Sequence, residues 1–197
     1  MTVLLDTDPP EGVVECIPTY RSLLLVYDPE VTGPERLQAQ LLAREAGMSA
    51  VSIPEPATVD IPVCYGGRFG PDIDAVASAH GLTEQAVVRI HSERVYPIYM
   101  IGFTPGFPFL GGLAEILHTP RLQSPRTRVP EGSVGIANNQ TGIYPVASPG
   151  GWQLIGRTPL RLFAPERKNP FLFKAGDHIR FRPIDAAEYA HLLERSE

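Results

Sequence analysis

Short, mainly apolar runs bounded by turn residues predict β-strands through much of the chain. In the first third, residues 12–17 and 21–27 are two such runs and predict two strands joined by the turn 18–20, that is, a β-hairpin. Residues 32–47 follow a helical period instead, and Thr32 and Glu35 have the spacing of a capping box at the start of that helix. This part is therefore predicted to contain two strands and a helix.

The stretch 53–57 follows neither period and contains Pro54 and Pro56. Each proline fixes φ and lacks an N–H, so two so close together are typical of a connection between folded parts. We therefore predict a small α/β domain over residues 1–57 and a second domain over residues 58–197.

The second domain is predicted to be mainly β. Its first strand, 59–65, contains Pro62, which favours an edge or entry position in a sheet because proline cannot donate to the ladder. Two short helices around Gly81 and a final helix complete the pattern. The helices are expected at 72–80, 83–91 and 185–195, and further strands at 94–101, 133–137, 142–146, 152–157, 160–163 and 178–183.

Glycine and proline are concentrated between Gly102 and Leu160, where ten of the 18 glycines and eight of the 21 prolines occur. Large apolar residues and the only tryptophan are interleaved with them, which argues against a flexible linker. Glycine permits positive φ and proline restricts φ, so the region is predicted to be sharply bent, buried backbone in a small barrel.

Composition and charge exclude several classes of function. The chain has a formal net charge of -5, which disfavours nucleic acid and anionic membranes as partners. The predicted helix pair resembles a helix-turn-helix, but residues 72–93 contain four carboxylates against the single Arg89, so DNA binding is not expected. Cys16 and Cys64 are isolated, and neither a signal peptide nor an apolar run near about 20 residues is present, so we expect a cytoplasmic protein without a membrane span.

Common catalytic motifs are absent from the sequence, including the phosphate-loop, dinucleotide-binding, nucleophile-elbow and H-E-x-x-H patterns. Self-contained catalysis is therefore disfavoured. His91 is the candidate catalytic residue, because it ends a predicted helix whose dipole favours the protonated imidazole. The alternative is a capping or core histidine.

Polar groups in two loops are candidates for binding a substrate or partner. Arg126, with Arg121 and Arg128 nearby, could clamp a phosphate or carboxylate, although a solvated loop fits equally well. Asn139 and Gln140 offer amides that match a lactam or urea group, and the alternative is a turn that satisfies its own backbone.

Aromatic residues in the glycine-rich region either pack in the core or form a surface on which a ligand binds. Tyr144 and Trp152 are candidates of this kind, as are Phe103 and Phe109. Phe107 is the one expected to face a partner or substrate, because Gly106 and Pro108 flank it and restrict the backbone that presents it.

Several long motifs occur in one order along the chain. They include I-P-V-C-Y-G-G at 61–67, G-F-T-P-G-F-P-F-L-G-G-L at 102–113, T-P-R at 119–121, Q-T-G-I-Y-P at 140–145, and S-P-G-G-W at 148–152 followed by G-R-T-P-L at 156–160. This series closely resembles the allophanate hydrolase subunit 1 family, also described as carboxyltransferase domain, subdomain C and D. That family includes the 5-oxoprolinase subunit PxpB and the kinase inhibitor KipI. The resemblance covers roughly residues 12–183.

The resemblance implies a small α/β domain followed by a cyclophilin-like β-barrel. Members usually have a further strand and helix before the segment that matches residues 12–15, so the N-terminal domain is expected to be a truncated ferredoxin-like unit with an exposed strand edge.

The implied function is that of one subunit of an ATP-dependent 5-oxoprolinase, inactive alone. The implied partners are subunit 2 (PxpC/KipA-like) and a third LamB/YcsF-like subunit (PxpA), with ATP and Mg²⁺ bound in the assembled complex and no metal assigned to this chain. The alternatives are a KipI-like inhibitor that binds a sensor histidine kinase, and part of an allophanate hydrolase or urea carboxylase-type carboxyltransferase.

In such an enzyme the lactam oxygen would be phosphorylated before water attacks, so negative charge must be stabilised near the ring. His91 is expected to transfer a proton, and Arg126 or Arg157 to stabilise the negative charge. Asn139, Gln140 and Tyr144 are expected to orient the amide.

Overall fold

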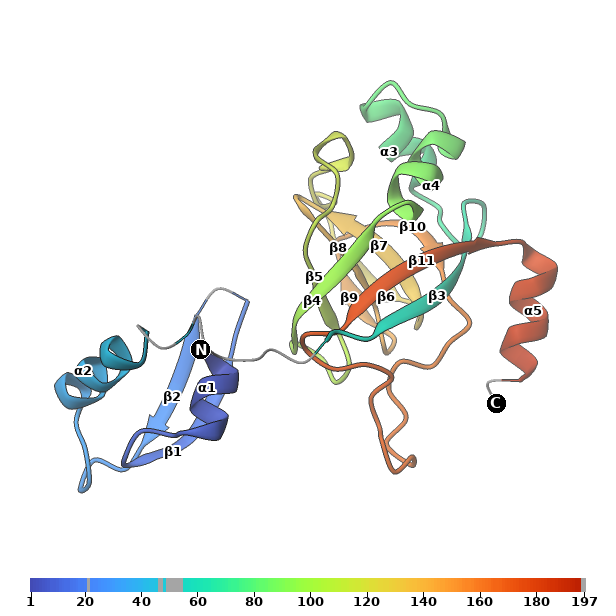
Figure 1. The fold of residues 1–197 in the computed structure, drawn as a ribbon. Coiled ribbons are helices and arrows are strands. Elements are labelled where there is room, and N and C mark those ends of the chain that lie inside the picture. The colour runs from blue at the N-terminus through green and yellow to red at the C-terminus, as the bar shows by residue number, and fades with distance from the viewer. Residues whose placement is uncertain (21, 46–47, 49–54, 196–197) are drawn as a thin grey trace. The chain divides into compact units, whose positions relative to one another are not determined.

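The computed structural model describes residues 1–20, 22–45, 48 and 55–195, and it divides into two compact units, Met1–Glu55 and Pro56–Glu197 (Figure 1). The predicted division after residue 57 lies two residues from this boundary. Ile53 and Pro54 of the predicted connection lie outside the described residues, as does Gly47 at the predicted end of the helix.

The first unit contains two helices and a two-stranded antiparallel sheet. Its elements are α1 (Thr2–Thr7), β1 (Val13–Pro18), β2 (Leu23–Tyr27) and α2 (Pro34–Glu45). The order α-β-β-α is that of the central elements of a ferredoxin-like βαββαβ unit. The apolar pattern predicts the hairpin and α2 but not α1.

The predicted capping box at Thr32 and Glu35 is wrong. Helix α2 begins at Pro34, and the carbonyl of Gly33 accepts the N–H of Leu37 at 3.0 Å. The helix thus starts one residue later than the box requires, with proline at its first position, where no N–H is needed. The Thr32 hydroxyl is buried and, among the described residues, has no hydrogen-bond partner.

The second unit is a nearly closed barrel of seven strands in the order β5-β4-β11-β3-β10-β7-β8. Only β3 and β11 pair in parallel among these described strands, and β5 and β8, the two ends of the order, contact each other. The predicted mainly β architecture is therefore confirmed. The strands are β3 (Thr58–Tyr65), β4 (Val95–Ile101), β5 (Pro108–Leu110), β7 (Ser133–Ala137), β8 (Gln140–Ile143), β10 (Gln153–Arg157) and β11 (His178–Ile184), with β6 (Arg126–Val129) paired separately to β9 (Ser148–Gly150).

The prediction that Pro62 marks an edge or entry position is wrong, because β3 lies between β11 and β10 and Pro62 is inside the strand. Strand β10 pairs only with Cys64 and Tyr65, beyond the proline, so the missing N–H breaks no bond on that side. The strand expected at 160–163 does not form either. Instead, Phe163 makes an isolated bridge with Phe171.

Helices cover parts of the barrel. Helix α3 (Ile73–Ala79) contacts β10, α4 (Glu84–Ser92) contacts β11, and α5 (Ala186–Glu194) contacts β3, while η2 (Glu115–Leu117) is a single 3-10 turn (Figure 1). Helix α3 places Val76 in the barrel core, and α4 places Val87 there. The helix pair that resembles a DNA-binding motif thus packs its apolar faces on the sheet.

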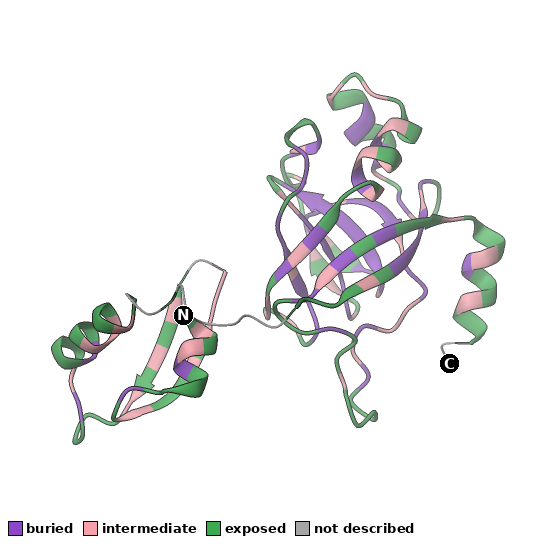
Figure 2. Cartoon of the chain, viewed as in Figure 1, coloured by how far each residue is buried: buried purple, intermediate pink, exposed green. Residues whose placement is uncertain are grey.

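Buried side chains are concentrated in the barrel, and the N-terminal unit buries few (Figure 2). The larger core cluster contains fully buried residues such as Ile61, Tyr96 and Phe181. A smaller cluster contains Phe107, Val129, Ala137, Tyr144, Trp152 and Leu154. Within the described ranges, no helix has the length and apolarity that crossing a bilayer requires.

Candidate functional site

Segments that lie far apart in the sequence meet at a cavity of about 130 Å³ in the barrel unit. They come from the turn before β5, β5 itself, the loop after η2, the segment after β8, β9, and the connection from β9 to β10. We call this cavity the aromatic pocket. Its described lining residues are Phe103, Phe107, Phe109, Arg121, Tyr144, Pro149, Gly150, Gly151 and Trp152.

Phe107 is the centre of the pocket wall. Its ring centroid lies 5.2 Å from that of Phe109, 5.6 Å from Trp152 and 5.8 Å from Tyr144, in edge-to-face arrangements. Such contacts between rings stabilise beyond the apolar area they bury. The predicted exposure of Phe107 is wrong, since only 3% of the residue is accessible and it packs inward between the other rings.

Phe103 is the aromatic residue of the pocket that reaches solvent. It is 79% exposed and has a φ of 68°, although it is not a glycine. Its ring meets the edge of Phe107 at a centroid distance of 6.0 Å. Bulky side chains rarely adopt positive φ, so this turn holds Phe103 at the pocket mouth under backbone strain.

Two glycines make room for the rings. A β-carbon on Gly142 would lie 3.1 Å from both Phe107 Cζ and Trp152 Cζ3, and one on Gly150 would collide with the Tyr144 phenol. Only glycine allows so close an approach of backbone to ring. The glycine-rich motifs therefore act by letting the aromatic wall close.

The charge around the pocket is positive. Arg121 has its guanidinium carbon 6.0 Å from the centre of the Trp152 ring, and the described lining contains no carboxylate. Burial raises the pKa of Tyr144, against the opposing effects of a backbone hydrogen bond from Trp152 and of the Arg121 and Arg126 charges. The phenol is therefore protonated at neutral pH and can donate.

Arg126 lies beside the pocket but is already bound by other groups. Its Nη2 donates to Asp72 Oδ1 at 2.6 Å, and its Nη1 donates to the carbonyl of Trp152 at 3.3 Å. Asp72 also accepts the N–H of Leu154 through Oδ2 at 2.6 Å. Arg126 therefore supports the strand that follows Trp152, and its fork is not free to clamp a ligand.

His91 lies in the core and has no accessible surface. Its Nδ1 is 2.8 Å from the Tyr65 hydroxyl and its Nε2 is 2.9 Å from Thr141 Oγ1. Burial lowers the pKa of His91 to about 3, so the prediction that the helix dipole keeps it protonated is wrong. The geometry favours the alternative, a core histidine that positions its neighbours.

The two predicted amides lie at the β7–β8 hairpin. Asn139 is exposed and Gln140 half-buried, and neither is among the described residues that line the aromatic pocket. Asn138 before them has a φ of 53° and donates its N–H to the carbonyl of Thr119 at 2.7 Å. The hairpin turn thus matches the alternative of a turn with a satisfied backbone.

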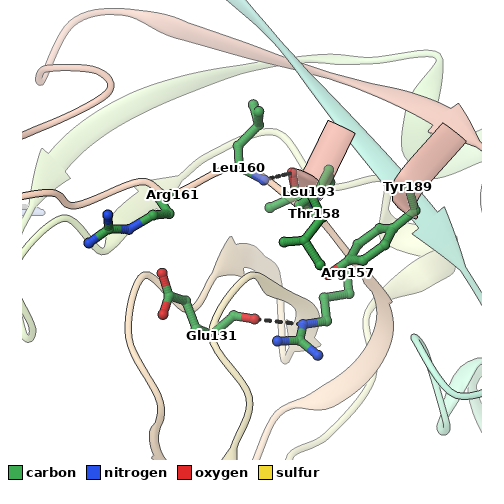
Figure 3. A pocket seen from close by; sticks show the side chains of 8 residues that line it. Glu131, Arg157, Thr158, Leu160, Arg161, Tyr189 and Leu193 are labelled. Atoms are coloured by element: carbon green, nitrogen blue, oxygen red, sulfur yellow. Dashed lines mark hydrogen bonds between the residues drawn. The ribbon is translucent and has the colours of Figure 1, made fainter. Parts of the chain in front are cut away.

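Arg157 lines a second cavity, of about 200 Å³, where α5 meets the barrel (Figure 3). Its Nε donates to the carbonyl of Glu131 at 2.7 Å, and Tyr189 from α5 lies beside it. Arg161 in the same cavity pairs with Glu166 at 2.7 Å. This cavity is larger, but its arginines are bound by groups of the chain, so we favour the aromatic pocket as the binding site.

Three predicted site residues, Phe107, Tyr144 and Trp152, thus come together in the aromatic pocket, while His91, Asn139, Gln140 and Arg157 lie elsewhere. Phe103 and Arg121 also line the aromatic pocket. The sequence had favoured Phe107 over Phe103, and Arg126 over Arg121, as the residue that binds a ligand. The signal for them was their position inside the glycine- and proline-rich motifs. Among the described residues, no group of three or more His, Cys, Asp or Glu side chains is placed to hold a metal ion.

The family model described as carboxyltransferase domain, subdomain C and D, matches residues 2–173. The chain belongs to this family. The motifs that identified it in the sequence, at 102–113, 119–121, 140–145 and 148–152, supply the residues that line the aromatic pocket and the Gly142 that packs against its wall.

Several known proteins are similar to most of the chain. A protein of Bacillus subtilis named as a 5-oxoprolinase subunit is 43% identical over 98% of this chain and 84% of its own, and one of the same name from Escherichia coli O157:H7 is 48% identical over 87% and 78%. A crystal structure of a conserved uncharacterized protein from Pyrococcus horikoshii is 46% identical, with a TM-score of 0.66 over 94% of this chain and 85% of that one. A more distant relative, a urea amidolyase of Lachancea kluyveri, is 28% identical over 64% of this chain but only 7% of its own.

Proposed function

We propose that this chain is a subunit of an ATP-dependent 5-oxoprolinase, which converts 5-oxo-L-proline, ATP and water to L-glutamate, ADP and phosphate. The observation that carries the proposal is the 43% identity to the Bacillus subtilis 5-oxoprolinase subunit over 98% of the chain. The match extends over both structural units, which supports a shared role for the whole chain and not only a shared barrel.

The chemistry supports a role that depends on partners. An unactivated lactam is a poor electrophile, so phosphorylation of its oxygen by ATP would make a leaving group that water can displace. The described lining of the aromatic pocket contains no carboxylate, thiol or imidazole that could act as a general base. We therefore propose that the chain is inactive alone and that catalytic groups come from other subunits.

The proposed partners are a subunit 2 of the PxpC/KipA type and a third subunit of the LamB/YcsF type (PxpA). The word "subunit" in the names of the relatives supports an assembly of several chains. ATP with Mg²⁺ is proposed to bind in that assembly. A cytoplasmic location is proposed from the two isolated cysteines, because disulfides form mainly in oxidising compartments.

The test is reconstitution with the two proposed partners, followed by measurement of ADP release that depends on 5-oxo-L-proline. We expect release from the complete set and a loss of nearly all of it when this chain is omitted. ADP release at the same rate with and without the chain would refute the proposal. The chain alone, assayed at the same concentration, is the matched control for inactivity.

The second candidate, part of a urea carboxyltransferase, is favoured by one observation, the 28% identity to a urea amidolyase. In the same assay, urea in place of 5-oxo-L-proline distinguishes the two candidates. Release of ADP that depends on urea and not on the lactam would favour the carboxyltransferase. The kinase-inhibitor alternative stays a prediction.

A further inference from the structure

We propose that the aromatic pocket binds a small ring carboxylate. The ring would lie against Phe107 and Trp152, Phe103 would close over it, and the carboxylate would bind Arg121 and the Tyr144 hydroxyl. The inference rests on the proposed function only for the choice of 5-oxo-L-proline as the ring acid. The pocket geometry carries the rest.

The volume of the pocket suits a single small ring. It measures about 130 Å³, and an apolar protein cavity of about 150 Å³ is known to accept benzene. A five-membered ring therefore fits the space, provided that its polar substituents reach the opening. Aromatic side chains form most of the wall, so the ring would replace water against apolar surface.

Tyr144 has a proton to offer a ligand. Burial raises the pKa of its phenol, so the O–H keeps its proton at neutral pH and can donate. The residue is only 3% exposed, and the phenol lies against Gly150 in the lining of the cavity. The hydroxyl is thus a fixed donor beside an apolar wall, as recognition of a carboxylate oxygen requires.

Arg121 supplies the positive charge at the same place. Its guanidinium lies over the Trp152 ring, and within the part of the chain that the structure describes no carboxylate lies within 4.0 Å of its nitrogen atoms. In contrast, Arg126 beside it is paired with Asp72. A planar guanidinium presents its N–H groups in a fork that matches a carboxylate.

Phe103 completes the pocket as a cover. Backbone hydrogen bonds hold its turn, from Gly102 N–H to the Phe107 carbonyl at 3.1 Å and from Phe107 N–H to the Thr104 carbonyl at 3.0 Å. An exposed ring at positive φ costs stability without burying its own surface. A ligand ring bound under Phe103 would bury the exposed face of the Phe103 ring in an apolar contact. This contact would give the strained backbone conformation a function.

The only tryptophan of the chain is Trp152, so intrinsic tryptophan fluorescence reports on this pocket alone. We would titrate the full chain, without nucleotide or partners, with 5-oxo-L-proline and with 2-pyrrolidinone, which has the same lactam ring but no carboxylate. The expected result is a saturable change in emission with the acid and at least about tenfold weaker binding of the uncharged ring. No saturable change with the acid would overturn the proposal.

Two pairs of variants separate the pocket from the rest of the surface. Arg121→Gln is expected to weaken binding of the acid about tenfold or more and to leave binding of 2-pyrrolidinone unchanged, whereas Arg128→Gln, at an exposed arginine outside the lining, changes neither. Phe103→Ala is expected to weaken the binding of both ligands. Phe171→Ala, at another exposed phenylalanine, is expected to weaken the binding of neither. Equal affinities in Arg121→Gln and Arg128→Gln, with unchanged circular dichroism, would refute the assignment.

The reconstituted complex distinguishes failure of this inference from failure of the proposed function. If the complex hydrolyses the lactam and Arg121→Gln leaves its KM unchanged, the pocket assignment is wrong and the function stands. If the chain binds the acid through Arg121 but the complete set of subunits releases no ADP with it, the pocket stands and the function is wrong.

Discussion

His91 lies in the last turn of helix α4, with both ring nitrogens bonded to hydroxyl groups and three aromatic rings around it. The rings of Phe181, Tyr96 and Tyr65 have centroids 4.5, 5.5 and 5.8 Å from that of the imidazole. A charge in this environment loses its hydration, and neither hydroxyl partner supplies a negative charge in return. Desolvation thus outweighs the helix dipole, and the imidazole is neutral at physiological pH.

A pH dependence of stability follows from this burial. The pKa of His91 is about 3 in the folded chain against an ordinary value of 6.5, so between these values the unfolded chain binds a proton that the folded chain does not. The free energy of unfolding therefore falls as the pH falls, by up to about 1.4 kcal/mol per pH unit from this residue. Urea denaturation between about pH 7 and 5 measures this slope, above the range where carboxylates become protonated.

The variant His91→Gln is expected to lose most of that slope, whatever its absolute stability, because glutamine does not titrate. His191→Gln, at an exposed histidine on α5, is the matched control and should keep it. Equal slopes in the wild type and His91→Gln would show that His91 does not control the pH dependence.

At the scale of elements, the start of α3 is tied to two strands. Asp72 occupies the cap position of this helix but makes no side-chain capping bond. Its carboxylate instead joins Arg126 of β6 and the N–H of Leu154 of β10, both at 2.6 Å. One side chain therefore fixes a helix, the separate β6–β9 sheet and the strand that follows Trp152.

Removal of this carboxylate should be costly. Asp72→Ala leaves a mostly buried guanidinium and a backbone N–H without their acceptor, and we expect a loss of about 2–4 kcal/mol in the free energy of unfolding. Chemical denaturation measures the loss. A double-mutant cycle with Arg126→Ala should give a coupling energy of about 1–3 kcal/mol.

The control for this ion pair is Asp60→Ala. Asp60 and Arg180 also meet at 2.7 Å, but both are about half exposed, so water screens them and the change should be far smaller. Similar losses in Asp72→Ala and Asp60→Ala would contradict the structural role of Asp72.

At the scale of the whole molecule, the two units differ in how they are stabilised. The larger core cluster lies entirely within the barrel unit, from Ile61 to Phe181. In the described part of the first unit, the buried apolar side chains are those of Leu5, Pro10 and Leu37. A unit of that size with so small a core is marginal by itself.

We therefore predict that residues 56–197 fold alone and that residues 1–55 do not. The barrel fragment should unfold cooperatively, with the same Trp152 emission as the full chain, because the aromatic pocket and both core clusters lie within it. Circular dichroism and thermal unfolding of the two fragments and the full chain measure this. A barrel fragment without a cooperative transition would contradict the prediction.

Much of the secondary structure was predictable because it depends on local pattern. The hairpin β1–β2, the helices α3, α4 and α5, and the strands β7, β10 and β11 formed close to the predicted positions. Strands β5, β6 and β9 were missed, since three or four residues carry too few alternations to show a period. The place of β3 in the centre of the sheet depends on its neighbours, which a single proline did not reveal.

The sequence by itself determined the mainly β class, through its short apolar runs between turn residues, and membership of the carboxyltransferase subdomain C and D family, through its ordered motifs. The tertiary structure alone decided that His91 is neutral, that Phe107 is buried while Phe103 is exposed, and that Arg126 is paired with Asp72. The reason is physical. Periodicity is a local property, whereas ionisation, exposure and pairing depend on which distant segments the fold brings together.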